Sequence, residues 1–259
     1  MKQPRMKRPG MKKLLLGFAL AAGPLLAQNN PAQNNSLLGI TLVESKTGQT
    51  LSMPMQIVLL MTVLTLLPAI FMSVTPFLRV VVVLHFLRQA LGTQTTPSNQ
   101  VLVGLALFLA LLVMQPVTEQ VYHEAWQPLE AGRLSASDAW DQAALPIHAF
   151  LLRFAREKDI QLFLELSHSP APAKPADVPM GALVPAYVLS ELRAAFQIGA
   201  VLFLPFLIID LVVASVTVSV GMVQLPPVMV SAPFKILLFV LVDGWNLVVG
   251  SLVRSFYSS

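Results

Sequence analysis

The sequence contains no cysteine and few charged side chains. Without a thiol, the chain can form no disulfide bond, and it offers neither a cysteine nucleophile nor a thiolate metal ligand. Charged residues make up only 12% of the chain and hydrophobic residues 55%, a composition too apolar for an ordinary soluble domain. The mean hydropathy of +0.70 points the same way. We therefore expect an integral membrane protein or a membrane-associated assembly protein.

The common motifs of hydrolytic and nucleotide-driven enzymes are also missing. There is no GxSxG nucleophile elbow, no GxxxxGK[ST] phosphate loop and no GxGxxG fingerprint. The four histidines, His85, His123, His148 and His168, include no pair with metal-ligand spacing such as HExxH. We predict no catalytic residue, no metal ligand and no cofactor, so that any energy source for transport would be a separate protein.

The excess of basic residues is confined to the N-terminus. Six of the 17 Lys and Arg lie in the first 13 residues, ahead of the apolar run LLLGFALAAGPLLA that ends at Ala27. This order is typical of a secretory signal peptide, which we predict over residues 1–27, with retention as a membrane anchor as the alternative. Residues 28–52 are polar and predict a flexible exported tail. Without the leader, acidic side chains outnumber basic ones, so no nucleic-acid partner is expected.

Two apolar segments follow, and they predict a first helical hairpin over residues 53–117. Pro68 and Pro76 are expected to kink or break the first segment. The turn at residues 92–100 contains no acid. Arginines precede this turn, so the positive-inside rule places it in the cytoplasm.

Charge returns abruptly over residues 118–181. This region has fourteen charged residues of both signs, against two between Leu51 and Val117. It includes an amphipathic stretch at 147–166 and a proline-rich connection before the next apolar segment. We predict a charged, mainly helical extracytoplasmic region between the second and third hydrophobic segments.

A second helical hairpin is predicted over residues 182–259. Its apolar blocks, Phe196–Val220 and Phe234–Val253, flank a turn at Gly221–Pro227, and each is near the roughly 20 residues that cross a bilayer as a helix. Together with the first hairpin this gives four predicted passes. The fold class that we expect is an all-α membrane protein.

Two acids, Asp210 and Asp243, lie inside the apolar blocks of the second hairpin. In a simple antiparallel hairpin they would lie at similar depth, and each would cost about 2.5 to 3.5 kcal/mol at a helix centre in lipid. They therefore need a bundle interior, a cation or water. Structural ion pairs and a proton-carrying role both remain open at this point. The cations available near apolar sequence are Arg79, Arg88, Arg193, Lys235 and Arg254.

Three long blocks resemble the FliP family of the flagellar type III export gate. They read TPFLRVVVVLHFLRQALGTQTTPSNQVLVGLALFL at 75–109, VPAYVLSELRAAFQIGAVLFLPFLIIDLVVASV at 184–216 and LPPVMVSAPFKILLFVLVDGWNLVVGSLVRSF at 225–256. The resemblance implies a bacterial inner-membrane channel at the flagellar basal body, through which unfolded flagellar proteins are exported. It also implies a homopentamer that assembles with FliQ, FliR and other membrane proteins of the export apparatus, in contact with membrane lipid.

The resemblance also implies roles for particular residues. The tip of the second hairpin is the expected pore gate, and it holds Met222, Val223, Gln224 and Leu225 where the family commonly has a run of methionines. Contacts between subunits or helices are expected at Glu191, Arg193, Asp210, Lys235, Asp243, Arg79, Arg88, Phe150 and Phe163. For the two phenylalanines, ordinary helix core is an equal alternative.

Three other functions stay open on the sequence. The two intramembrane acids are compatible with a proton-coupled secondary transporter, although the two halves of the chain do not repeat one another. An injectisome export-apparatus subunit would share the same core blocks. A membrane-anchored assembly factor would use the region 118–181 and need its helices only as anchors.

Overall fold

The structure, a computed structural model, describes residues 53–170, 172–221 and 226–257. The predicted signal peptide, the predicted exported tail and the four predicted gate residues, Met222 to Leu225, lie outside these ranges. The chain divides into two compact units, Met1–Gln56 and Ile57–Ser259, and the packing reported below lies within the second. Over the described ranges the regular structure is entirely helical, which confirms the expected all-α fold class.

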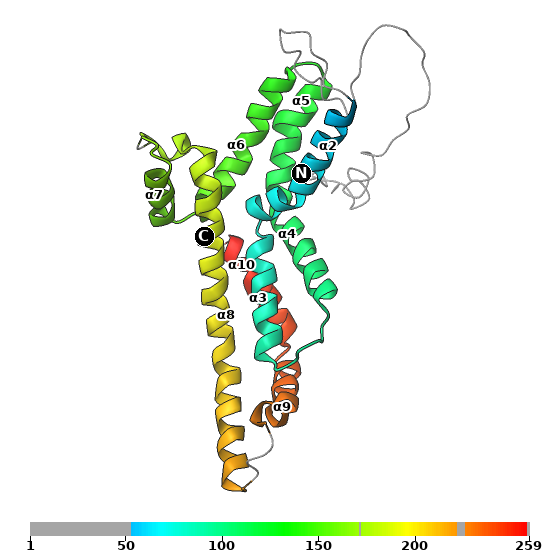
Figure 1. Ribbon diagram of the computed structural model, residues 1–259, viewed down its shortest axis with the longest axis vertical. Coiled ribbons are helices and arrows are strands. Elements are labelled where there is room, and N and C mark those ends of the chain that lie inside the picture. The colour runs from blue at the N-terminus through cyan, green and yellow to red at the C-terminus, as the bar shows by residue number, and fades with distance from the viewer. Residues whose placement is uncertain (1–52, 171, 222–225, 258–259) are drawn as a thin grey trace, which may run out of the picture. The chain divides into compact units, whose positions relative to one another are not determined.

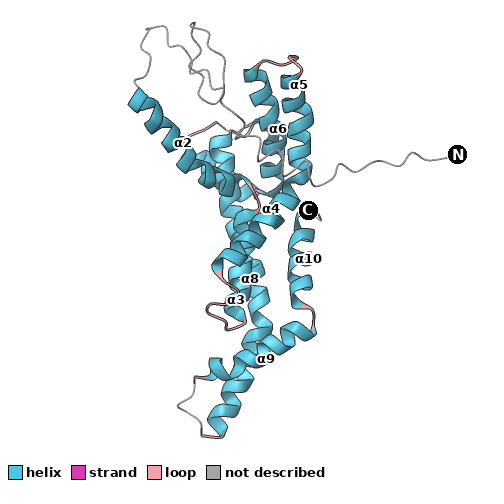
Figure 2. Ribbon diagram, turned by 90° about the vertical axis from the view of Figure 1, so that its right-hand side faces the viewer, coloured by secondary structure: helices cyan, strands magenta, loops and turns pink. Residues whose placement is uncertain are grey.

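Nine α-helices and two short helical turns follow one another in these ranges (Figures 1 and 2). In chain order they are α2 (Met53–Val74), α3 (Phe77–Ala90), α4 (Asn99–Val121), a π-helical turn η3 (Tyr122–Trp126), α5 (Gln127–Glu130), α6 (Ala136–Phe154), α7 (Glu157–Leu166), a 3-10 turn η4 (Pro175–Asp177), α8 (Met180–Ser219), α9 (Pro227–Leu241) and α10 (Gly244–Tyr257).

Three of these helical segments are long and apolar enough to cross a membrane: Met55–Val74, Asn99–Glu130 and Met180–Ser219. A fourth results if α9 and α10, which are bent by 66° relative to each other, form one span. Helix α8 has 40 residues and is therefore about 60 Å long, twice the roughly 30 Å of hydrocarbon in a bilayer. When the helix crosses the bilayer, only about half of this length can therefore lie in the hydrocarbon.

Helix α3 is the centre of the packing. It packs along α8 and against α4. Helices α3 and α8 lie side by side in both views (Figures 1 and 2). The main apolar core joins these helices to the C-terminal helix α10. Its buried members include Val80, Val83 and Leu84 from α3, Leu102, Ala106 and Leu109 from α4, Ala195 from α8, and Leu252 and Phe256 from α10.

Prolines act on the first apolar segment in two different ways. Pro68 lies inside α2 without ending it, whereas the helix stops at Val74 and α3 begins just after Pro76. The Thr75 hydroxyl lies 2.9 Å from the Phe71 carbonyl oxygen, and it satisfies a carbonyl in the last turn of α2. The break is therefore at Thr75–Pro76 alone.

The second apolar block of the C-terminal hairpin is not one helix, contrary to the sequence interpretation. It divides between α9 and α10 at Asp243, which has a left-handed φ of 51°. Gly244 follows directly, and a Cβ there would lie 2.2 Å from the ring of Phe239. An Asp residue tolerates left-handed φ and only Gly fits beneath the ring, so this pair forms the corner.

The charged region 118–181 is mainly helical. Helix α4 continues through Pro116 into η3 and α5, and α6 then returns beside them (Figure 2). The amphipathic stretch at 147–166 is divided between α6 and α7 at Ala155–Arg156, and α7 packs on α8. A His148 ring nitrogen lies 2.8 Å from the Val178 carbonyl oxygen, which ties α6 to the connection before α8.

Candidate functional site

A buried ion pair joins α3 to α8. The side chains of Arg79 and Glu191 are only 8% and 0% exposed, and both Nε and Nη2 of Arg79 donate to the Glu191 carboxylate. The Nε–Oε2 distance is 2.8 Å. This two-point geometry offsets much of the cost of removing both charges from water, whereas removal of one partner would strand the other charge in the core.

The same guanidinium contacts two more helices. Arg79 Nη1 donates to the Ser255 hydroxyl on α10 at 3.2 Å. The guanidinium carbon lies 4.0 Å from the ring centroid of Phe256 and 5.7 Å from that of Phe154, which belongs to α6. One cation therefore holds four helices, α3, α6, α8 and α10, at one level of the bundle.

A second ion pair joins α8 to α9. Lys235 Nζ lies 2.6 Å from Asp210 Oδ2, and the Ser231 hydroxyl donates to Asp210 Oδ1 at 2.5 Å. The Lys235 side chain is 2% exposed, whereas that of Asp210 keeps 24%. Ser231 and Lys235 are one helical turn apart, so both reach the same carboxylate from α9.

A third polar group fixes α7 to α8. The Ser190 hydroxyl donates to Asp159 Oδ2 at 2.7 Å and accepts from the backbone N–H of Arg156 at 2.9 Å. Arg193 approaches the other oxygen of Asp159 at 3.6 Å while its side chain remains 44% exposed. Arg193 thus neighbours Asp159 rather than Glu191, its close neighbour in the sequence.

The two acids of the second hairpin do not meet. Asp210 is held by Ser231 and Lys235, whereas Asp243 is exposed at the corner between α9 and α10 and accepts from Asn246 Nδ2 at 3.1 Å. Lys235 precedes Asp243 by eight residues, which is about 12 Å along a helix. The similar depth expected from a simple hairpin is therefore wrong, because the register of α9 against α8 places Lys235, and not Asp243, beside Asp210.

The remaining predicted contact residues lie elsewhere in the bundle. Arg88 Nη1 donates to Asn99 Oδ1 at 2.6 Å and so closes the turn between α3 and α4. The ring of Phe150 lies 5.0 Å from that of Phe154 and 6.1 Å from that of Tyr187, inside the packing of α6 on α8. Phe163 is half-buried on α7.

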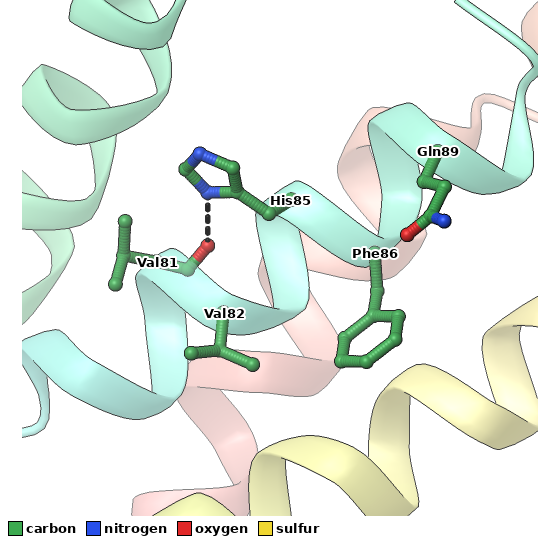
Figure 3. Close-up of a pocket in the computed structure, with 5 residues that line it drawn as sticks. All are labelled: Val81, Val82, His85, Phe86 and Gln89. Carbon is green, nitrogen blue, oxygen red and sulfur yellow. Dashed lines mark hydrogen bonds between the residues drawn. The ribbon is translucent and has the colours of Figure 1, made fainter.

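The described ranges offer no metal site, and an apolar groove lies along one helix. No group of three or more His, Asp or Glu residues there could hold a metal ion. This apolar groove of about 300 Å³ runs along α3 and is lined by Val81, Val82, His85, Phe86 and Gln89 (Figure 3). The side chains of His85 and Phe86 point away from one another, and a His85 ring nitrogen lies 2.8 Å from the Val81 carbonyl oxygen (Figure 3).

The geometry is that of a helical bundle held by buried ion pairs, and comparison with known proteins identifies its family. The model of the FliP family matches residues 60–252, which include both buried ion pairs. The chain belongs to the FliP family. The resemblance seen in the three sequence blocks is thereby confirmed.

Several relatives carry the name flagellar biosynthetic protein FliP. That of Pectobacterium carotovorum subsp. carotovorum is 51% identical over 211 residues, which cover 82% of each chain. That of Bacillus subtilis (strain 168) is 47% identical over 217 residues, 84% of this chain and 98% of the relative. That of Cereibacter sphaeroides is 45% identical over 253 residues, 98% of this chain and 83% of the relative.

Sequence reasoning missed several polar partners in this FliP-family bundle. Ser231 lies four residues before Lys235, and that helical spacing would have placed both on one face of α9. Asp159 and Ser190 are 31 residues apart, and Arg79 and Ser255 are 176 apart. No local spacing rule connects these residues, because their contacts result from the packing of whole helices.

Proposed function

We propose that this chain is a structural subunit of the flagellar type III export gate, the inner-membrane channel through which unfolded flagellar proteins leave the cytoplasm. It acts at the flagellar basal body as a homopentamer with FliQ and FliR, and it has no enzymatic activity of its own. Residues 1–27 serve as a signal peptide that is removed on export of the N-terminus. Membership in the FliP family supports this role.

The observation that carries the proposal is an ion pair set in a long exposed apolar face. Large apolar side chains on α8 are exposed from Phe196 to Val220, a length of about 36 Å, and those of α9 continue the face. Asp210 lies in the middle of this face and keeps 24% exposure. An ionised group in contact with hydrocarbon costs about 2.5 to 3.5 kcal/mol. Neighbouring subunits that donate a hydrogen bond to Asp210 and cover the apolar side chains would lower that cost.

The length of α8 supports the same conclusion. Eight of the ten buried residues of α8 lie between Ala182 and Gly199, whereas only Phe206 and Thr217 are buried in the rest of the helix. The exposed apolar side chains include Val201, Leu204, Leu207, Ile208, Leu211 and Val212 on α8, and Met229, Leu237, Val240 and Leu241 on α9. An apolar face longer than the roughly 30 Å of hydrocarbon needs protein over part of its length.

We propose further that the tip between α8 and α9 faces the pore. Met222, Val223, Gln224 and Leu225 form this tip, and a seal of flexible and aliphatic side chains fits a channel that passes varied unfolded chains. Replacing the four residues with Ala and Gly in the assembled complex should raise ion conductance across the membrane. Unchanged conductance would contradict the assignment of the tip to the gate.

A complementation experiment tests the export role. The full chain is produced in a flagellated bacterium that lacks its own FliP-family gene, and secreted hook protein and flagellin are measured in the medium. We expect export to be restored by the wild-type chain and lost when α8 and α9 are deleted. Export by a variant that retains region 118–181 with unrelated membrane anchors would contradict the proposal and favour the assembly-factor alternative.

A further inference from the structure

Tyr187 is a buried polar residue that the contacts above do not explain. Its side chain is 1% exposed on the face of α8 that packs against α6, and its hydroxyl has no hydrogen-bond partner among the residues in the structure. Around the ring lie apolar side chains, including Leu151, Val178 and Leu183. A phenol hydroxyl buried without a partner costs about 1 to 3 kcal/mol, so this position calls for one.

A second protein chain cannot supply that partner. At 1% exposure the hydroxyl is closed off by its own chain, and its neighbour Phe150 packs its ring 6.1 Å from the tyrosine ring. Inside the chain, one polar side chain with free acceptor positions is on the same helix. Glu191 follows Tyr187 by four residues, which places both on the same face of α8.

The ion pair has hydrogen-bonding capacity left over. A carboxylate has about four acceptor positions, and Arg79 occupies two of those on Glu191. The Glu191 carboxylate and the Tyr187 hydroxyl are on neighbouring turns of the same face of α8. The two groups make no direct hydrogen bond, so a bridge between them requires a small polar molecule that both donates and accepts.

We propose that a water molecule is bound in the core beside Tyr187, where it accepts a hydrogen bond from the phenol O–H and donates one to the Glu191 carboxylate. Buried waters of this kind make about three hydrogen bonds to groups that would otherwise be unsatisfied. The water extends the ion pair into a polar chain that runs from Ser255 on α10, through Arg79 and Glu191, to Tyr187. The site belongs to the fold of the single chain and does not depend on the export role.

Water-edited solid-state NMR on the assembled complex in lipid bilayers tests the proposal. A ¹³C-labelled tyrosine is introduced at position 187 alone, and magnetisation transfer from water to its Cζ carbon is followed. We expect transfer at short mixing times although the residue is buried. A labelled methyl group of Leu102, which is 0% exposed in the core between α3 and α4, is the matched control and should receive none. If the Tyr187 carbon, like the Leu102 methyl group, receives no magnetisation from water, the proposal is overturned.

The variant Tyr187→Phe provides a second readout. If a water is bound, loss of the phenol removes one of its partners and the melting temperature of the complex should fall. If the hydroxyl is unpaired, its removal should raise the melting temperature, since an apolar ring suits an apolar pocket better. Tyr257→Phe, at an exposed position on α10, is the control and should leave the melting temperature unchanged.

Discussion

Removal of the charge on Arg79 should destabilise the bundle far more than removal of the whole ion pair. Arg79→Met leaves the Glu191 carboxylate at 0% exposure without its cation, and breaking a buried pair on one side costs about 3 to 5 kcal/mol. Replacing both partners, with Arg79→Met and Glu191→Leu, leaves no buried charge. Such replacements are often neutral or stabilising, by about 1 to 4 kcal/mol.

The contacts of Arg79 with Phe256 and Phe154 modify that expectation. The guanidinium lies 4.0 Å from the Phe256 ring centroid, and a desolvated cation–π contact of this kind contributes about 2 kcal/mol. The double variant should therefore recover most, but not all, of the stability that Arg79→Met loses. The stability that the double variant does not recover, relative to wild type, measures the contribution of the contact between the guanidinium and the Phe256 ring.

The assay is a double-mutant cycle on the detergent-extracted protein, with the free energy of unfolding measured for wild type, both single variants and the double variant. We expect a coupling energy of at least about 3 kcal/mol between the two positions. Arg133→Met, at an exposed loop position, is the control and should change stability by less than about 0.5 kcal/mol. Additive effects of the two single variants would refute the reasoning.

The other predictions concern the α8–α9 contact and the α3–α8 contact. Lys235→Met should abolish assembly of the complex, because it leaves Asp210 with no cation in an apolar face. Assembly is measured by size-exclusion chromatography, and assembly of this variant at the wild-type level would contradict the role of the Lys235–Asp210 pair. Asp210→Asn should also impair assembly, and a variant that assembles normally yet loses only proton-coupled export would favour proton transfer instead. Gly199→Ala should lower the free energy of unfolding by about 1 to 3 kcal/mol, because the added Cβ would lie 2.5 Å from the Phe86 ring. The control is Gly104→Ala, where the added Cβ has nothing within 4 Å, and it should be neutral in thermal unfolding.

The sequence predicted the apolar segments well because their signal is local. Hydropathy alone separates the apolar segments from the charged region 118–181, and the turn at residues 92–100 lies between α3 and α4 as expected. The need of Asp210 for a cation was also foreseeable, since an acid in an apolar helix has few other options. Which of the five candidate cations pairs with Asp210 depends on the register of α9 against α8. No local sequence pattern specifies that register, so Lys235 could not be singled out.

The corner at Asp243 shows where hydropathy misleads. The block Phe234–Val253 is apolar enough to read as one helix, yet Asp243–Gly244 is a dipeptide that favours turns. Its left-handed backbone and the close approach of Phe239 to Gly244 separate α9 from α10. Because of this bend, α10 reaches the guanidinium of Arg79, where Ser255 accepts a hydrogen bond. The sequence interpretation overlooked the turn at Asp243–Gly244 and therefore could not anticipate this contact.

The Arg79–Glu191 pair could not be predicted as a pair. The two residues are 112 positions apart, and both belong to segments whose hydropathy suggests membrane spans. Only the packing of α3 along α8 brings them together, and it places α10 over them. The family resemblance assigned Glu191 to a contact between subunits or helices, and in the structure its carboxylate pairs with Arg79 of the same chain.

The central claim is that sister subunits cover the exposed face of α8 and α9. The most direct test is the mass of the detergent-extracted complex, produced together with FliQ and FliR and measured by native mass spectrometry. The account predicts a complex that contains five copies of this chain and that persists after lipid is removed. A chain that runs only as a monomer near its 28.1 kDa mass, or at the lower mass left after leader cleavage, would contradict it.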